Sequence, residues 1–144
     1  MKRILDESPF WFLTQLHYEA AQLLIEVTEG IVSSSPRNVS VDDLGPIENA
    51  RPIEITRQSR RVRITFSNVL AYQVTDESYW SSDTDEEAAG TVLCLHKKSD
   101  YLDYVMGNSI IKECVDDPLR HYSLSLADDI VEVITTSEPS TALI

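Results

Sequence analysis

Residues 61–74 read RVRITFSNVLAYQV, and this stretch decides the fold. In its first six residues, the apolar side chains Val62, Ile64 and Phe66 alternate with polar ones. A period of two is typical of a strand that turns one face to the core and the other to water. Ser67-Asn68 interrupts the pattern, and residues 69–74 resume it as a more buried strand.

Strand-like segments recur on both sides of this stretch, at 53–56, 91–96, 121–126 and 130–135. With a hairpin near the N-terminus, they predict about seven or eight strands and a mainly β fold. The architecture expected is an antiparallel sandwich or a strongly curved sheet. One short helix is predicted over 100–106, because Ser99 is a good N-cap and Gly107 a good end signal.

Residues 9–30 allow two interpretations. Pro9 and Gly30 bracket apolar residues at roughly helical spacing, which favours one helix. The aromatic run at 10–12 and the alternation at 23–27 favour strands instead. We predict a hairpin with strands at about 11–18 and 23–32.

The length of 144 residues suits a single domain over 1–144. Residues 33–50 are rich in Ser, Pro, Asp and Asn, which predicts a flexible connector, and residues 137–144 are expected to be a loose tail. No long apolar run or signal peptide is recognisable, so a cytoplasmic location is expected. Two cysteines form no disulfide framework, and Cys94 is expected to be a buried apolar residue.

The charge is strongly one-sided. The chain has 24 Asp plus Glu against 12 Lys plus Arg, a formal net charge of −12. Such a surface repels nucleic acid and anionic lipid, and it favours a basic protein partner. We therefore expect neither a nucleic acid nor a membrane partner.

Several segments resemble those of a family of small uncharacterised bacterial proteins. They are FSNVLAYQVTDESY (66–79), SDYLDYV (99–105) and HYSLSLADDIVEVITTSEP (121–139), with LHYEAAQLLIEVTEG (16–30) similar to a family hairpin. The resemblance implies no activity, cofactor or catalytic residue. Genes for small acidic proteins of this kind often lie near bacterial toxin genes, which hints at an immunity role.

No motif assigns a catalytic residue, cofactor or metal. One hypothesis is that Cys94, His96 and His121 converge from two strands to hold zinc, although no ligand spacing links them. The alternative is structural, with His96 at a strand end and His121 beside a core tyrosine. Residues 121–126 alternate, so Tyr122 should face the core and His121 and Ser123 should face water. No nucleophile elbow or Gly-rich phosphate loop occurs.

Four arginines cluster around one predicted hairpin turn, at Arg57, Arg60, Arg61 and Arg63. They can grip a phosphate, pair with acidic side chains on neighbouring strands, or meet acidic residues of a second copy. The last alternative predicts a homodimer in which these four residues mediate self-association.

An acidic loop at 75–90 contains two adjacent aromatic residues. Aromatic side chains flanked by carboxylates resemble the centre and rim of a protein interface. The candidate partner-binding residues are Tyr79, Trp80, Asp83, Asp85, Glu86 and Glu87. The alternative, which we favour for Trp80, is that its ring folds back to cap the sandwich.

Three functional hypotheses follow. The first is a non-enzymatic acidic module that binds a basic protein, as an immunity protein binds a toxin. The second is a homo-oligomeric structural domain. The third is an enzyme or small-ligand binder, which a concave pocket with two titratable groups in hydrogen-bond contact would raise above the other two.

Overall fold

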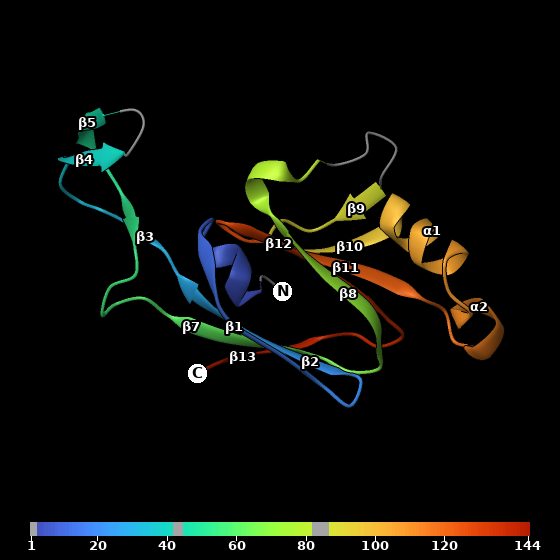
Figure 1. The fold of residues 1–144 in the computed structure, drawn as a ribbon. Helices are drawn as coiled ribbons and strands as arrows, with labels where there is room; N and C mark the ends of the chain where they lie inside the picture. The colour runs from blue at the N-terminus through green and yellow to red at the C-terminus, as the bar shows by residue number, and fades with distance from the viewer. Residues whose placement is uncertain (1–2, 42–44, 82–86) are drawn as a thin grey trace.

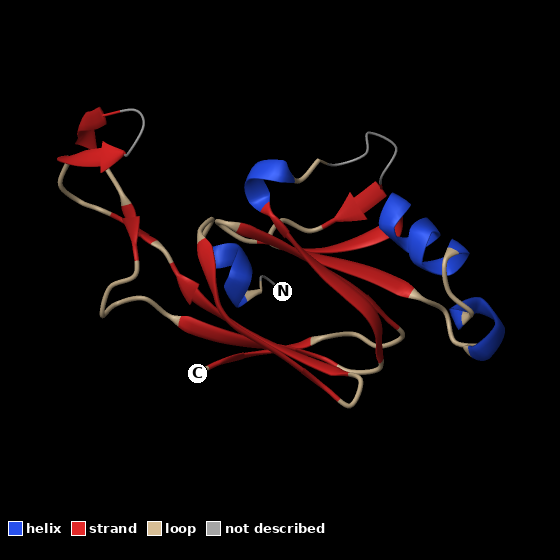
Figure 2. Ribbon diagram, viewed as in Figure 1, coloured by secondary structure: helices blue, strands red, loops and turns tan. Residues whose placement is uncertain are grey.

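A computed structural model describes residues 3–41, 45–81 and 87–144. Within these ranges the fold is mainly β, as predicted, and strands dominate the molecule (Figure 2). The helix expected at 100–106 is α1 (Asp100–Gly107), capped by Ser99, whose Oγ accepts a hydrogen bond from the Leu102 amide at 3.1 Å. No helix of the described ranges is both long enough and apolar enough to cross a membrane.

Two antiparallel sheets form the body of the molecule (Figure 1). The four-stranded sheet has the order β1 (Trp11–Glu19), β2 (Gln22–Glu29), β7 (Arg61–Phe66) and β13 (Ser140–Leu143). The five-stranded sheet has the order β8 (Val69–Asp76), β12 (Asp129–Thr135), β11 (Arg120–Ser125), β10 (Leu93–Lys98) and β9 (Glu87–Ala89). Apolar side chains from both sheets form one continuous core, so the architecture is a sandwich.

The stretch 61–74 joins the two sheets. Its first strand, β7, lies at the centre of the four-stranded sheet, where Val62, Ile64 and Phe66 are fully buried. Asn68 has a φ of 53°, a left-handed conformation that asparagine tolerates well, and there the chain turns into β8 at the edge of the other sheet. The break predicted at Ser67-Asn68 is therefore the corner between the two layers.

The N-terminal segment is a hairpin, as predicted, and not a helix. β1 and β2 pair antiparallel from Trp11 opposite Glu29 to Glu19 opposite Gln22. Ala20 and Ala21 form the turn with φ values of 49° and 63°. Positive φ at both central residues matches the twist of the flanking strands, although glycine or asparagine usually occupies such positions.

Trp11 joins the N-terminal turn to the core. Its side chain is fully buried, and its indole Nε1 donates to the carbonyls of Leu5 at 2.9 Å and Ser8 at 3.0 Å. Leu5 belongs to a short 3-10 turn, η1 (Ile4–Glu7), and is also fully buried. The N-terminal segment is therefore part of the core.

The predicted connector and tail both contain strands. Within 33–50, β4 (Arg37–Val41) pairs with β5 (Gly45–Ala50), at the end of an arm formed by β3 (Ile31–Val32) and β6 (Ile53–Glu54) (Figure 1). The tail was expected to be loose, but β13 pairs with β7 over four residues and forms one edge of the sheet. Backbone pairing to an interior strand of the sheet explains why this short segment is ordered.

Two helical turns complete the chain. α2 (Ile111–Cys114) follows α1, and η2 (Glu77–Tyr79) follows β8. η2 and α1 lie over the same side of the five-stranded sheet (Figure 1). Their position creates the candidate site.

Candidate functional site

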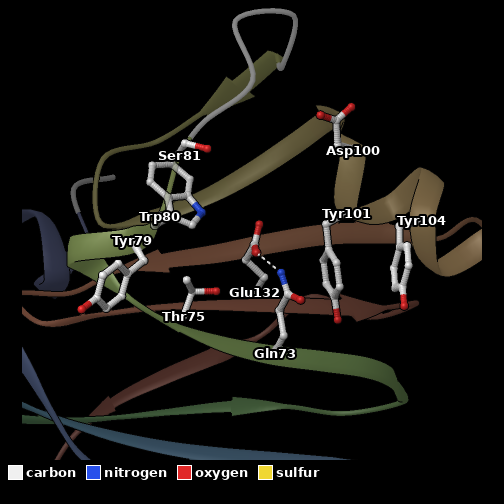
Figure 3. Close-up of a pocket in the computed structure, with 9 residues that line it drawn as sticks. All are labelled: Gln73, Thr75, Tyr79, Trp80, Ser81, Asp100, Tyr101, Tyr104 and Glu132. Atoms are coloured by element: carbon white, nitrogen blue, oxygen red, sulfur yellow. Dashed lines mark hydrogen bonds between the residues drawn. The ribbon is translucent and has the colours of Figure 1, made fainter.

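A pocket of about 440 Å³ lies on the outer face of the five-stranded sheet, between η2 and α1 (Figure 3). Gln73 and Thr75 of β8 and Glu132 of β12 point into it from the sheet. The complete lining is Gln73, Thr75, Tyr79, Trp80, Ser81, Asp100, Tyr101, Tyr104 and Glu132.

The centre of the pocket floor is a buried carboxylate. Glu132 stands opposite Gln73 in the β12–β8 register, and the Gln73 Nε2 donates a hydrogen bond to its Oε2. Only 6% of the Glu132 side chain is exposed. Burial raises the pKa of this carboxyl, but the contacts from His121 and Gln73 outweigh it and lower the pKa overall. The pocket floor is therefore negatively charged at neutral pH.

Two stacked imidazoles lie next to this carboxylate, and one of them contacts it. His121 is fully buried, with its Nε2 3.3 Å from the Glu132 Oε1 and its Nδ1 2.6 Å from the Ser99 Oγ. Its ring stacks on that of His96 with centroids 4.2 Å apart and 15° between the planes. His96 Nε2 lies 2.7 Å from the Ser123 Oγ. The expectation that His121 and Ser123 face water is wrong, because α1 covers this face of the sheet and both are buried.

Burial, the largest influence, and the adjacent His121 together lower the pKa of His96 to about 4, although the Glu132 charge opposes them. His96 is consequently neutral at physiological pH. A neutral ring can stack on a second imidazole without charge repulsion, so the pair behaves as a packed element of the structure.

The two histidines converge, as the zinc hypothesis requires. Among the described residues, no group of three His, Cys, Asp or Glu side chains is arranged to hold a metal. Cys94 is only half-buried, which corrects the expectation of a buried core residue, and its Sγ donates to the Thr91 carbonyl at 3.3 Å. Burial, the largest influence, raises the pKa of this thiol, which disfavours the thiolate that zinc requires.

Ser99, His121 and Glu132 form a line that resembles a catalytic serine–histidine–carboxylate set. The set cannot work as a catalytic one, because a substrate has no access to Ser99. Ser99 is 2% exposed, it caps α1, and it is not part of the pocket lining. A nucleophile must reach its substrate. This line is best interpreted as the attachment of α1 to the sheet.

Aromatic side chains form the pocket walls. Tyr79 ends η2 and Trp80 follows it, while Tyr101 and Tyr104 lie three residues apart on one side of α1 (Figure 3). Tyr101 packs edge-on against His121, with centroids 5.5 Å apart. Burial, together with the Glu132 charge, raises the pKa of Tyr101 to about 12, so its hydroxyl keeps its proton.

The structure brings the two predicted aromatic residues into the pocket. Tyr79 is 84% exposed, and Trp80 lines the outer face of the sheet and does not pack against the sandwich core, so the favoured capping interpretation is wrong. Of the predicted acidic residues, Asp83, Asp85 and Glu86 lie outside the described residues, and Glu87 begins β9.

The arginine cluster is largely paired within the chain. Arg61 and Arg63 bind the Glu26 carboxylate across β7 and β2, at 3.1 and 2.8 Å. Arg60 binds Glu29 at 2.7 Å and also contacts Glu7. The contacts from Arg63, the largest influence, lower the pKa of Glu26. Arg57 forms no ion pair with the described residues. The cross-strand interpretation therefore holds for three of the four arginines.

Sequence reasoning missed Glu132, Gln73 and the two α1 tyrosines. One signal was present: Glu132 is the only charged residue in the apolar run IVEVI (130–134). A lone carboxylate inside a strand whose other face is buried indicates either a solvated face or a polar site. Only the position of α1 decides between them.

The chain matches no family model, no curated protein and no solved structure.

Proposed function

We propose that this protein is a non-enzymatic, acidic binding module that docks a basic protein partner at the pocket between η2 and α1. The observation that carries the proposal is the meeting of exposed aromatic side chains with an ionised, buried carboxylate in one pocket. Aromatic anchors in a desolvated centre are the groups that contribute most to protein binding.

The charge of the whole chain supports the same partner. A net charge of −12 attracts a basic protein over several ångströms and repels polyanions. Asp100 at the start of α1 adds a second carboxylate to the pocket. In its sharpest form the proposal is an immunity protein that neutralises a basic bacterial toxin in the cytoplasm, in line with the family resemblance of residues 66–79, 99–105 and 121–139.

The test begins with affinity capture from a lysate of the source cells, using the native chain and Trp80→Ala as bait. The matched control is Tyr18→Ala, which removes an exposed aromatic ring from the opposite sheet. We expect a basic protein that the native chain and the control retain and that Trp80→Ala loses. The association rate of this protein should fall at least about tenfold as salt rises from about 20 to about 500 mM.

A partner that is captured equally by Trp80→Ala would place docking elsewhere. An association rate that does not change with salt would remove electrostatic steering from the proposal.

A small-ligand binder is a second candidate, because the pocket volume lies in the range of small-molecule sites, about 300–1,000 Å³. It ranks below docking because only one of the two titratable groups in contact lines the pocket: Glu132 does, whereas His121 is fully buried and does not. The homo-oligomer is supported less, since the Arg60, Arg61 and Arg63 charges are already paired inside one copy. Light scattering at low and high salt tests it, and a monomer at both would eliminate it.

A further inference from the structure

We infer that the pocket receives a guanidinium group, the side chain of an arginine on the partner surface. This inference rests on the proposed docking function and specifies the chemistry of the group that enters. Three features of the pocket carry it: the polarity of the floor, the shape of the walls and the charge at the rim.

The floor accepts hydrogen bonds and carries negative charge. The Glu132 carboxylate accepts hydrogen bonds, and this fixes which end of the Gln73 amide faces it. Because the Gln73 Nε2 donates to Glu132, the amide oxygen of the same side chain is left as an acceptor. A ligand that fits this floor supplies several N–H donors, and an anionic ligand is repelled by Glu132 and Asp100.

The walls favour a flat cation. Tyr79 and Trp80 stand on one side of Glu132, and Tyr101 and Tyr104 stand on the other (Figure 3). Aromatic faces attract cations, and tryptophan does so most strongly. The fold already uses this contact elsewhere, since the Arg60 Cζ lies 5.9 Å from the centroid of the Trp11 ring.

Among organic cations, guanidinium meets the requirements of both the floor and the walls: it has several N–H donors and it is flat. It is planar, it is weakly hydrated, and it presents five N–H donors in a fork that matches a carboxylate. A quaternary ammonium has no donors for the Glu132 and Gln73 oxygens. A lysine ammonium has three donors but is strongly hydrated and cannot stack as a plane.

The test measures binding of blocked small probes by calorimetry and by two-dimensional NMR. The probes are N-acetyl-arginine methylamide, its lysine and citrulline counterparts, tetramethylammonium and free arginine. Citrulline has nearly the shape of arginine without the charge. The two tryptophans provide an internal comparison, because Trp80 lines the pocket and Trp11 is fully buried.

We expect the arginine probe to bind in the millimolar range and to shift the Trp80 indole resonance but not that of Trp11. Citrulline and tetramethylammonium should bind at least about tenfold more weakly, and lysine several-fold more weakly. Trp80→Ala and Asp100→Asn should each weaken arginine binding several-fold, whereas Glu19→Gln, on the exposed end of β1, should not. Glu132→Gln should abolish it, with the NMR spectrum verifying the fold of this buried variant.

Equal binding of citrulline and arginine, or arginine binding that survives Trp80→Ala and Asp100→Asn, would overturn the inference. Free arginine binding as tightly as the blocked probe would show that the source is a small metabolite and not a protein side chain. If no arginine probe binds while a basic partner is still captured through Trp80, the inference fails and the docking function stands. If the arginine probe binds through Trp80 and no partner is captured, the docking function fails and the guanidinium specificity stands.

Discussion

Acidification should destabilise the protein through His96. The ring is buried and stacked on His121, and its pKa is lowered from 6.5 to about 4. In the unfolded chain His96 takes up a proton near pH 6.5, but in the folded chain it does so only near pH 4. The unfolded state therefore binds more protons between these values, and stability falls as the pH falls through this window.

The size of the effect follows from the two pKa values. The shift corresponds to about 3 kcal/mol of unfolding free energy between about pH 7.5 and about pH 4. The negative charge of Glu132 raises the pKa of His96, but the lowering by burial and by His121 is larger. The pKa of Glu132, like those of Glu26 and Glu29, is lowered from 4.5. The stability that these ionised carboxylates contribute is therefore lost as the pH falls below 4.5, mainly below the pH range in which His96 acts.

The assay is urea unfolding followed by tryptophan fluorescence, since Trp11 is fully buried and reports on the core. We compare the native chain with His96→Gln, whose amide can reach Ser123 but does not titrate. His17→Gln is the matched control, because the side chain of His17 is 61% exposed. The native chain and the control should lose about 3 kcal/mol more than His96→Gln between about pH 7.5 and about pH 4. Equal losses in all three would refute the reasoning.

Four further predictions concern the fold. Replacing Ala20-Ala21 by Asn-Gly should raise the unfolding free energy by about 1 kcal/mol, because both positions have positive φ; a urea midpoint equal to that of the native chain would contradict it. Trp11→Phe should cost about 2 kcal/mol, since the carbonyls of Leu5 and Ser8 lose their buried donor, and thermal unfolding measures this. Ser99→Ala should cost about 1 kcal/mol by removing the cap of α1, with amide exchange loosened first in that helix; uniform exchange would argue against it. A chain ended after Pro139 lacks β13 and should melt several degrees lower, and an unchanged melting temperature would mean that this strand contributes nothing.

The fold was predictable where the pattern is local. The alternation of Val62, Ile64 and Phe66 defines β7, and Ser99 defines the start of α1. Neighbour relations were not predictable, because β8 follows β7 directly in sequence yet pairs with β12 in the other sheet. That choice depends on long-range register, which no window of the sequence contains.

Only the part of the candidate site that depends on local sequence was predictable. Tyr79 and Trp80 are conspicuous as aromatic residues in an acidic loop. Glu132 and His121 alternate with core residues, so each was consistent with a face turned to water. The tertiary position of α1 changes that environment, and with it the chemistry of the sheet face.

The pairing of β7 with β13 has a consequence for biosynthesis. These strands are neighbours, although all five strands of the other sheet lie between them in the chain. A nascent chain that has just emerged through β7 can pair this strand with β2, but the partner of its other edge has yet to be translated. Such high contact order slows folding, and it leaves an unpaired strand edge exposed for the interval. Chaperones that shield extended segments should accordingly associate with this protein on the ribosome.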